Sequence, residues 1–371
     1  MRRAAGIALL GLVLVAVGGL FDASPLYVPG VAFVLLGLLA PAWVALAAWR
    51  VRIHRELDVR RVVEDEPVPV RISVRAGELP LPVAAVEDPL LDAPLRLPTG
   101  SRARSFTVVA RFPRRGRRRF APPALVLRDP FELARRVVRG SGEEELLVLP
   151  RTSAVALGAG RGDDGRSGGV AALLGSAATD VDGVRPYREG TPAARIHWPA
   201  LARGVGLMER RLRVEADARP LVVLDARGAG SREELDAAVR AAASLVLAFA
   251  RAGGGALLLP GERRPSTIAE DLAGWAAAHV RLALVEGGPS TPAPALSGAG
   301  MRRGPLVYVA ARRIQQLPPA ARGLARGSAT LVVPGALSGR EALFAVAGCR
   351  GYAVSQRVIG TSAASGEALA P

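Results

Sequence analysis

Two uncharged apolar stretches decide how the chain begins: AAGIALLGLVLVAVGGL at residues 4–20 and VAFVLLGLLAPAWVALAAW at residues 31–49. Each is about as long as a helix that crosses the hydrocarbon core of a bilayer. The connection between them contains Pro25 and Pro29, which predict a break between two helices. Residues 1–50 therefore predict a transmembrane helical hairpin.

Arginines flank this hairpin at both of its outer ends. Arg2 and Arg3 precede the first stretch, whereas Arg50, Arg52 and Arg55 follow the second. By the positive-inside rule, we expect a plasma-membrane protein with both termini and all soluble domains in the cytoplasm, and with the lipid bilayer as a partner. The alternative for the first stretch is a cleaved signal peptide. The second apolar stretch, with arginines behind it, favours two retained helices.

Composition limits the classes of partner. Half of the 371 residues are hydrophobic and 22% are charged, which is the composition of folded domains. The formal net charge is +16, and every one of the 49 Lys and Arg positions is arginine. This positive charge either attracts anionic lipid or nucleic acid, or belongs to arginines that are simply solvated on the protein surface. The sequence has no recognition-helix, zinc-finger or aromatic–basic pattern, so we expect no nucleic-acid partner.

Short alternating stretches between turn residues characterise residues 51–151. Apolar and polar residues alternate over residues 68–74, for example, as they do in half-buried strands. The regular spacing predicts a small antiparallel β-sandwich. The stretch PRRGRRR at residues 113–119 is either a basic hairpin tip near the anionic leaflet or an exposed turn. The glycine-rich residues 152–180 predict a linker.

Strand and helix patterns alternate from residue 220 onward. Ser231 and Glu234 predict a capping box at the start of a helix. The alternation predicts an α/β domain with a mainly parallel sheet. The expected strands occupy residues 221–224, 256–259, 280–285, 306–309 and 330–333, and the expected helices occupy residues 233–251, 267–279 and 315–325.

A motif-rich segment precedes this domain. It reads DGVRPYREG at residues 182–190, RIHW at residues 195–198 and AR at residues 202–203. It resembles the signature of the bacterial family called domain of unknown function 58, in which such motifs precede a strand ending in Asp. In that family the strand opens a von Willebrand factor type A-like domain. The resemblance covers nearly the whole chain, including RDPF at residues 128–131, and assigns residues 181–371 to the signature plus a type A-like α/β domain.

The resemblance also singles out a set of site residues. Arginine presents a planar fork of donors suited to carboxylate or phosphate, and Tyr and Trp add large apolar faces. One departure is Thr191, which stands after Gly190 where the family usually has Asp. Two interpretations stay open: a buried latch to the α/β domain through arginine–glutamate pairs, or a partner-binding surface. The site residues are Arg185, Tyr187, Gly190, Arg195, His197, Trp198 and Arg203, and the acids available to a latch are Glu189, Glu209 and Glu215.

Type A domains often bind a divalent cation through Asp-x-Ser-x-Ser at the end of their first strand. The resemblance places DARGA, from Asp225 to Ala229, at that position, so only the first ligand is present. Arg227 stands where the first Ser would be, and its fixed positive charge opposes a metal. We expect Arg227 to pair with Asp225 in place of an ion, with no metal and no other cofactor. Cys349 is the only cysteine, which excludes a cysteine-rich zinc site within one chain.

The resemblance implies a membrane-anchored, non-catalytic adaptor or assembly factor of chaperone-like character. Family members are commonly encoded beside a MoxR-type AAA+ ATPase and transglutaminase-like membrane proteins, which are therefore the expected partners. We expect no enzyme, because no nucleophile with a nearby base is evident. The alternatives are a membrane-bound, hydrolase-like enzyme with His197 as its base, and a surface protein that binds anionic lipid.

Overall fold

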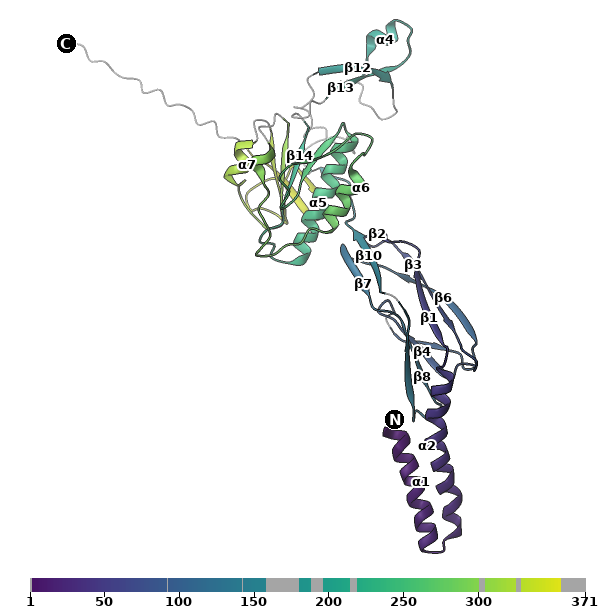
Figure 1. Cartoon of the computed structure of the whole chain (residues 1–371). Helices are drawn as coiled ribbons and strands as arrows, with labels where there is room; N and C mark the ends of the chain where they lie inside the picture. Colours follow the sequence, from purple (N-terminus) through teal and green to yellow (C-terminus); the bar gives the residue numbers. More distant parts are fainter. Residues whose placement is uncertain are drawn as a thin grey trace, which may run out of the picture. The chain divides into compact units, whose positions relative to one another are not determined.

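The computed structural model divides into two compact units, Met1–Val148 (the first unit) and Leu149–Pro371 (the second unit) (Figure 1). Each unit is described by itself. The residues that the structure describes are 2–91, 93–141, 143–157, 180–187, 196–213, 219–299, 304–324 and 328–354.

The first unit begins with two apolar helices, α1 (Arg2–Leu20) and α2 (Tyr27–Ala47), joined by a short 3₁₀ turn. Both are long and apolar enough to cross a membrane, and they pack against each other as predicted. The prediction that Pro29 breaks the chain between them is wrong, because Pro29 lies in the first turn of α2. A proline there has no N–H to satisfy, and its fixed φ suits the helix.

Small residues form the seam between these helices. Ala4, Gly11 and Gly18 of α1 recur every seven residues and are buried, as are Gly30 and Gly37 of α2. A Cβ atom added at Gly11 would lie 2.6 Å from the Gly30 carbonyl oxygen, and one at Gly37 would lie 2.6 Å from the Ala4 carbonyl oxygen. The backbones therefore approach as closely as they do in membrane helix pairs with small residues at the interface.

Replacing Gly37 by alanine is expected to destabilise this helix pair by about 1–3 kcal/mol, the usual range for overpacking. The added methyl group meets backbone atoms of α1, which cannot rotate away. Thermal unfolding of the detergent-solubilised protein, followed by circular dichroism, measures the loss. Gly6→Ala is the matched control, because a Cβ at Gly6 has nothing within 4 Å. Equal midpoints for the two variants would contradict the close approach.

The rest of the first unit consists of small antiparallel sheets. Their strand orders are β1-β3-β6, β2-β10-β7 and β5-β4-β8-β9. Alternate side chains of β3 are buried, as the sequence pattern predicted. The strands are β1 (Arg52–Leu57), β2 (Arg61–Val63), β3 (Val68–Arg75), β4 (Val83–Glu87), β5 (Leu95–Leu97), β6 (Ala103–Ala110), β7 (Gly116–Phe120), β8 (Ala124–Arg128), β9 (Arg135–Arg139) and β10 (Glu144–Leu149).

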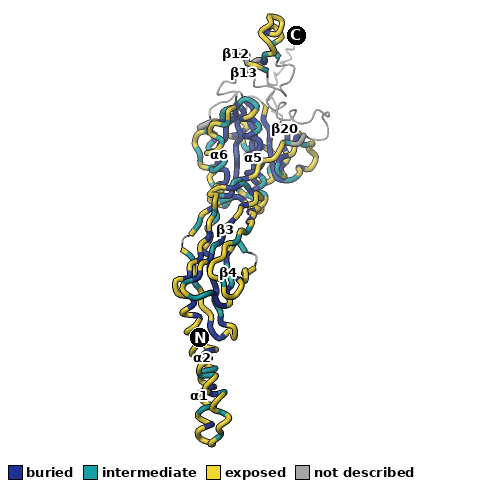
Figure 2. Tube along the Cα trace, turned by 90° about the vertical axis from the view of Figure 1, so that its right-hand side faces the viewer, coloured by how far each residue is buried: buried dark blue, intermediate teal, exposed yellow. Residues whose placement is uncertain are grey.

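The end of α2 belongs to the core of these sheets. Val44 is 1% exposed and packs in one cluster with buried residues of the sheets, such as Ile72 and Leu125. Ala47 is completely buried. One face of the last turns of α2 is therefore covered by protein, whereas the outer faces of both helices are exposed (Figure 2).

The arginine-rich residues 113–119 are no hairpin tip, because β6 and β7 belong to different sheets, and only the first part of the run, with the exposed Arg114, is a turn. Gly116–Phe120 is strand β7, which pairs with β10. Arg115 is 5% exposed, and its backbone N–H donates to Glu64 Oε1 at 2.9 Å. Arg119 donates from Nε to Glu145 Oε1 at 2.6 Å. The strand is hard to predict from the sequence because two of its charges, on Arg117 and Arg119, pair with Glu145 of the distant strand β10.

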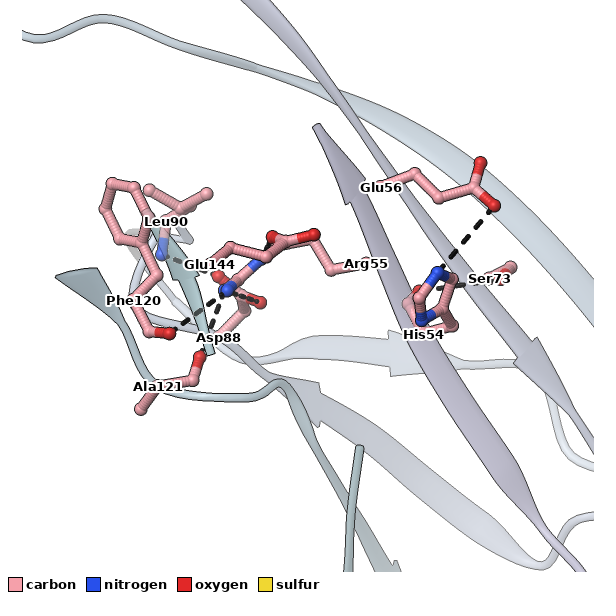
Figure 3. A network of polar contacts seen from close by, with 9 residues as sticks. All are labelled: His54, Arg55, Glu56, Ser73, Asp88, Leu90, Phe120, Ala121 and Glu144. Atoms are coloured by element: carbon pink, nitrogen blue, oxygen red, sulfur yellow. Dashed lines mark hydrogen bonds and ion pairs between the residues drawn. The ribbon is translucent and has the colours of Figure 1, made fainter. Parts of the chain in front are cut away.

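A buried arginine joins several segments of the first unit (Figure 3). Arg55 in β1 is 2% exposed, and it donates from Nε to Glu144 Oε2 at 2.6 Å and from Nη1 to Asp88 Oδ2 at 3.0 Å. It also donates to the carbonyl oxygens of Ala121 at 3.2 Å and Phe120 at 3.4 Å. The Phe120 ring centroid lies 5.5 Å from Cζ of Arg55. Arg55 therefore places its charge in the core and does not serve as a cation flanking the apolar helix.

The second unit is built on a mixed sheet of order β11-β19-β20-β18-β17-β14-β15-β16. Its four central strands, β18, β17, β14 and β15, are parallel, and the outer pairs are antiparallel. Helices cover both faces of the sheet, with α5 and α6 on one and α7 on the other (Figure 1). The elements are β11 (Ala156–Leu157), β14 (Leu221–Asp225), α5 (Arg232–Arg251), β15 (Gly255–Leu258), β16 (Ser266–Ile268), α6 (Trp275–Ala283), η4 (Leu296–Ala299), β17 (Leu306–Ala310), α7 (Pro319–Leu324), β18 (Ala329–Pro334), β19 (Phe344–Val346) and β20 (Cys349–Val354).

The predicted helix at residues 267–279 is correct only from residue 275 onward, and the predicted strand at residues 280–285 is wrong. Ser266–Ile268 is the edge strand β16, and α6 begins only after Gly274, whose φ of +88° favours glycine. The apolar run that follows buries Ala278 and Leu282 on one helical face. A short apolar run fits a buried strand or a buried helix equally well, so periodicity alone does not distinguish them.

A third element lies between the linker and β14. Strands β12 (Asp180–Pro186) and β13 (Met208–Arg213) form an antiparallel hairpin, and the short helix α4 (Trp198–Ala202) lies between them in the sequence. Part of the predicted linker at residues 152–180 is a strand: β11 pairs with β19 at the edge of the mixed sheet. Residues 158–179 lie outside the part of the chain that the structure describes.

Candidate functional site

The carboxyl end of β14 carries a closed cluster of three polar side chains. Asp225 is completely buried, and its Oδ1 accepts hydrogen bonds from Arg227 Nε at 2.8 Å and from the Arg227 backbone N–H at 3.2 Å. Its Oδ2 accepts from Arg227 Nη2 at 3.0 Å and from the Tyr308 hydroxyl at 2.7 Å. Both carboxylate oxygens of Asp225 therefore have two donors each.

The fold brings these three residues together in a simple way. Asp225 ends β14, which lies between β15 and β17 in the middle of the sheet. In the register of the parallel pair, Tyr308 of β17 lies beside Val223 of β14. Val223 precedes Asp225 by two residues in the same strand. Alternate side chains share a face, so Asp225 and Tyr308 project to the same side. This face packs against the core cluster that includes α7.

The protonation states in the cluster follow from burial and hydrogen bonding. Burial would raise the pKa of Asp225, but the hydrogen bonds from Arg227 and Tyr308 outweigh it and hold that pKa below its ordinary value. Burial, reinforced by the bond to Asp225, raises the pKa of Tyr308 above its ordinary value. The bond to Asp225 raises the pKa of Arg227. At neutral pH the cluster therefore holds an anion, a cation and a neutral phenol.

The expected pairing of Arg227 with Asp225 is present. The residue types fit a metal poorly at this place, because the only carboxylate is saturated by donors and the nearest charged group is a guanidinium. Among the described residues, no three His, Cys, Asp or Glu side chains gather closely enough to hold a metal ion. Arg312 follows β17, and its side chain lies 3.1 Å from where a Cβ of Gly228 would be.

The β12–β13 hairpin brings together several residues of the motif-rich segment at residues 182–203. The register of β12 and β13 sets Arg185 opposite Glu209, and Glu209 also bridges to Ile196. The Tyr187 N–H donates to the Leu207 carbonyl at 3.0 Å, and the His197 N–H donates to the Met208 carbonyl at 2.8 Å. The segment is thus one local β-structure. Glu189, Gly190, Thr191, Arg195 and Glu215 lie outside the described residues.

His197 has a structural task in this hairpin. Its Nδ1 accepts a hydrogen bond from the Ala200 N–H at 3.2 Å, which caps the start of α4. In the neutral form, Nε2 therefore carries the proton. The lone pair that a general base needs is therefore the one on Nδ1, so His197 could accept a proton only by giving up the cap.

Apolar side chains gather in the exposed part of the hairpin. Trp198 is 56% exposed, Leu201 42%, Val205 65% and Leu207 41%. We call these four residues the α4 patch. Arg203 lies exposed within the same stretch, whereas Glu209 is buried. Trp198 and Arg203 are thus on the surface, where the partner-binding interpretation needs them.

Sequence reasoning missed parts of both sites. Leu201, Val205 and Leu207 follow Trp198 at spacings of two to four residues, a signal of an apolar surface that the motif search overlooked. Tyr308 was read as one residue of a buried strand, although a hydroxyl in such a strand needs a partner.

The lone cysteine behaves as a small buried side chain. Cys349 begins β20 and is completely buried. Burial, with a smaller effect of the Glu234 carboxylate, raises the pKa of its thiol to about 12. The thiol therefore stays protonated at neutral pH and is a poor nucleophile.

Comparison with known proteins adds no identity to this geometry. No protein-family model matches the chain, and no curated protein matches its sequence.

Proposed function

We propose that this protein is a membrane-anchored, non-catalytic adaptor that binds a partner protein through the α4 patch. The observation that carries the proposal is that Trp198 and three other large apolar side chains are all exposed within residues 198–207. Tryptophan is the residue most enriched at the energetic centres of protein interfaces. Water-exposed apolar clusters of this kind mark interaction sites in soluble proteins.

The α1–α2 hairpin supports the membrane part of the proposal. Its seam consists of small residues, whereas its outer face carries leucines such as Leu9, 62% exposed, and Leu39, 61% exposed. Such a distribution suits lipid outside and close backbone packing inside. By the positive-inside rule, the arginines that flank the two apolar stretches favour a cytoplasmic location for both units. Arg2 and Arg3 before the first stretch and Arg50 and Arg52 after the second are enough for this, although Arg55 is buried and no longer counts.

The resemblance to the family called domain of unknown function 58 names the partner class. We infer that the second unit is a von Willebrand factor type A-like domain and that the sheets of the first unit form a β-sandwich. The inferred partners are a bacterial MoxR-type AAA+ ATPase and transglutaminase-like membrane proteins. The mixed sheet, with Asp225 at the end of a central parallel strand, is consistent with such a domain.

Arg227 has a defined part in this proposal. Its guanidinium holds the Asp225 carboxylate in the geometry that a cation would otherwise impose, and the domain keeps its shape without metal. Calorimetric titration of the solubilised protein with Mn²⁺ tests this, and micromolar affinity that disappears in Asp225→Asn would overturn it.

A capture experiment from the protein's own membranes tests the adaptor function. Tagged protein with Trp198→Ser and Leu201→Ser is expected to retain at least tenfold less AAA+ ATPase than the unaltered chain, because the centre of the interface is lost. Val109→Ser is the matched control, since Val109 is 60% exposed on β6 in the first unit. Equal capture of the ATPase by both variants would refute the α4 patch as the binding surface. Capture of no ATPase by the unaltered chain would refute the partner class.

A further inference from the structure

The turn between β8 and β9 is held in a fixed shape by one buried carboxylate. Asp129 is 2% exposed, and it accepts hydrogen bonds from the Ala134 N–H at 2.6 Å and from the Phe131 N–H at 2.9 Å. Glu132 adopts a φ of +55°, which turns the chain sharply. Phe131 is left 64% exposed at the tip of this turn. A large aromatic ring is thus presented to the surroundings by a turn whose backbone is fixed.

The same turn contacts the helical hairpin. Leu133 is 7% exposed and packs with Ala4 of α1 and Ala40 of α2. Ile7 and Leu36 are the partly buried neighbours of this cluster. The tip of a β-hairpin in the first unit therefore rests on the two apolar helices, close to the start of α1.

The position of Ala4 fixes the depth of this contact. Ala4 follows Arg3 directly, so the first turn of α1 marks the boundary between headgroups and hydrocarbon if the helices span a bilayer. Ile7 lies almost one helical turn deeper, and it also borders the cluster of Leu133. Leu133 therefore lies at the boundary or just inside it. Phe131, two residues away on the same turn, lies at a similar depth.

Residues around the turn have the chemistry of a membrane interface. Trp43 of α2, 43% exposed, lies one helical turn beyond Ala40. Arg135 and Arg136 begin β9 and are exposed, although Arg135 also pairs with Glu87 at 3.3 Å. Aromatic rings prefer the interfacial region, and arginine stems lie along apolar surface while their charges reach the headgroups. This combination fits a lipid surface better than water.

We propose that the Asp129–Ala134 turn is a second membrane contact, in which Phe131 inserts into the interfacial region of the bilayer. The proposal rests on the membrane anchoring proposed above. It assigns a role to an aromatic side chain that packs little against the protein. With the helices and this turn both in contact with lipid, the first unit has a second point of attachment that fixes its orientation on the membrane.

Site-specific fluorescence in vesicles tests the contact. The full chain, with Cys349→Ala and Phe131→Cys, is labelled with an environment-sensitive dye and reconstituted into vesicles of phosphatidylcholine and phosphatidylglycerol. We expect a blue-shifted emission that lipids brominated near the headgroup quench at least twofold. Val109→Cys in the same background is the control, because Val109 lies at the end of the β3–β6 pair that is remote from α2. Val109 pairs with Pro69 near the start of β3, whereas Arg75 at the other end of β3 pairs with Arg52, which follows α2. Its dye should remain in water and escape quenching.

Flotation of the vesicles separates the two proposals. If the protein floats with the vesicles while the dye at position 131 emits as it does in water, the turn contact is refuted and the anchor stands. If the protein does not float, the anchor itself fails. A second variant, Phe131→Ser, should float like the unaltered chain but make Arg136 in β9 more accessible to trypsin in the vesicles. Unchanged cleavage there would also count against insertion of the turn.

Discussion

Replacing Arg55 by methionine is expected to cost the first unit about 3–5 kcal/mol of stability, the largest effect of any single substitution considered. The guanidinium is 1% exposed and its partner Asp88 has a completely buried side chain, so the variant leaves an uncompensated carboxylate in the core. Glu144 and two backbone carbonyls lose a donor at the same time. Methionine keeps the unbranched apolar stem but not the guanidinium, so the loss combines the charge, its hydrogen bonds and its contact with the Phe120 ring.

Hydrogen exchange measured by mass spectrometry gives this result for the first unit alone. Peptides from β1 and β10 in the solubilised variant should exchange roughly 10²- to more than 10³-fold faster, since each 1.4 kcal/mol is a factor of ten. Arg50→Met is the control, because Arg50 and Glu78 form an ion pair with side chains 68% and 79% exposed. Exposed pairs contribute about 0–1 kcal/mol. Similar exchange in both variants would show that the buried network stabilises little.

Removal of Arg227 is the second large effect, at about 2–3 kcal/mol for Arg227→Met. The cost is smaller than for Arg55 because the Arg227 side chain is 35% exposed and Tyr308 remains to donate to Asp225. Exchange of peptides from β14 and β17 should rise roughly 30- to 150-fold in the variant. Arg312→Met, on the exposed residue beside Gly228, should change little and serves as the control.

The pH dependence of this loss distinguishes charge from packing. Folding lowers the pKa of Asp225. The ionised carboxylate therefore contributes to stability above the ordinary carboxyl pKa, and this contribution is lost as the pH falls through the lowered pKa. In the variant without Arg227, the effect of burial on Asp225 is opposed by fewer hydrogen bonds, so the pKa of Asp225 rises. Protonation of Asp225 at low pH then removes the unpaired buried charge and stabilises the variant. The difference in stability between the two proteins should therefore narrow as the pH falls below about 4. A difference independent of pH would indicate that Arg227 acts only by packing.

The elements that the sequence predicted best are those whose signal is local. The two apolar helices are evident from their length and lack of charge. The strands at Leu221–Asp225 and Leu306–Ala310 are evident from the short apolar runs at residues 221–224 and 306–309. The capping box is also local: the Glu234 N–H donates to the Ser231 hydroxyl at 3.1 Å. In the second bond of the motif the Gly230 N–H donates to Glu234 Oε2 at 2.9 Å, one residue earlier than in the simplest form of the capping box.

The features that were missed depend on partners far away in the chain. Arg55 is charged, and charged residues are seldom buried, so only the positions of Asp88 and Glu144 reveal its place in the core. Strand β7 is hidden by its arginines, which need β10 beside them to form a strand. At the candidate site, Arg227 and Asp225 are two residues apart and their pairing was predicted. Tyr308 joins them from 83 positions away and was not.

The burial of Val44 and Ala47 has a consequence for how the protein matures. Because the end of α2 fills part of the core of the sheets, the first unit completes its folding only when that helix lies in its final place. The folding of the sheets is therefore coupled to the placement of α2. A soluble fragment cut after the apolar stretch would lack a piece of its own interior, whereas one that starts near Pro41 would retain it.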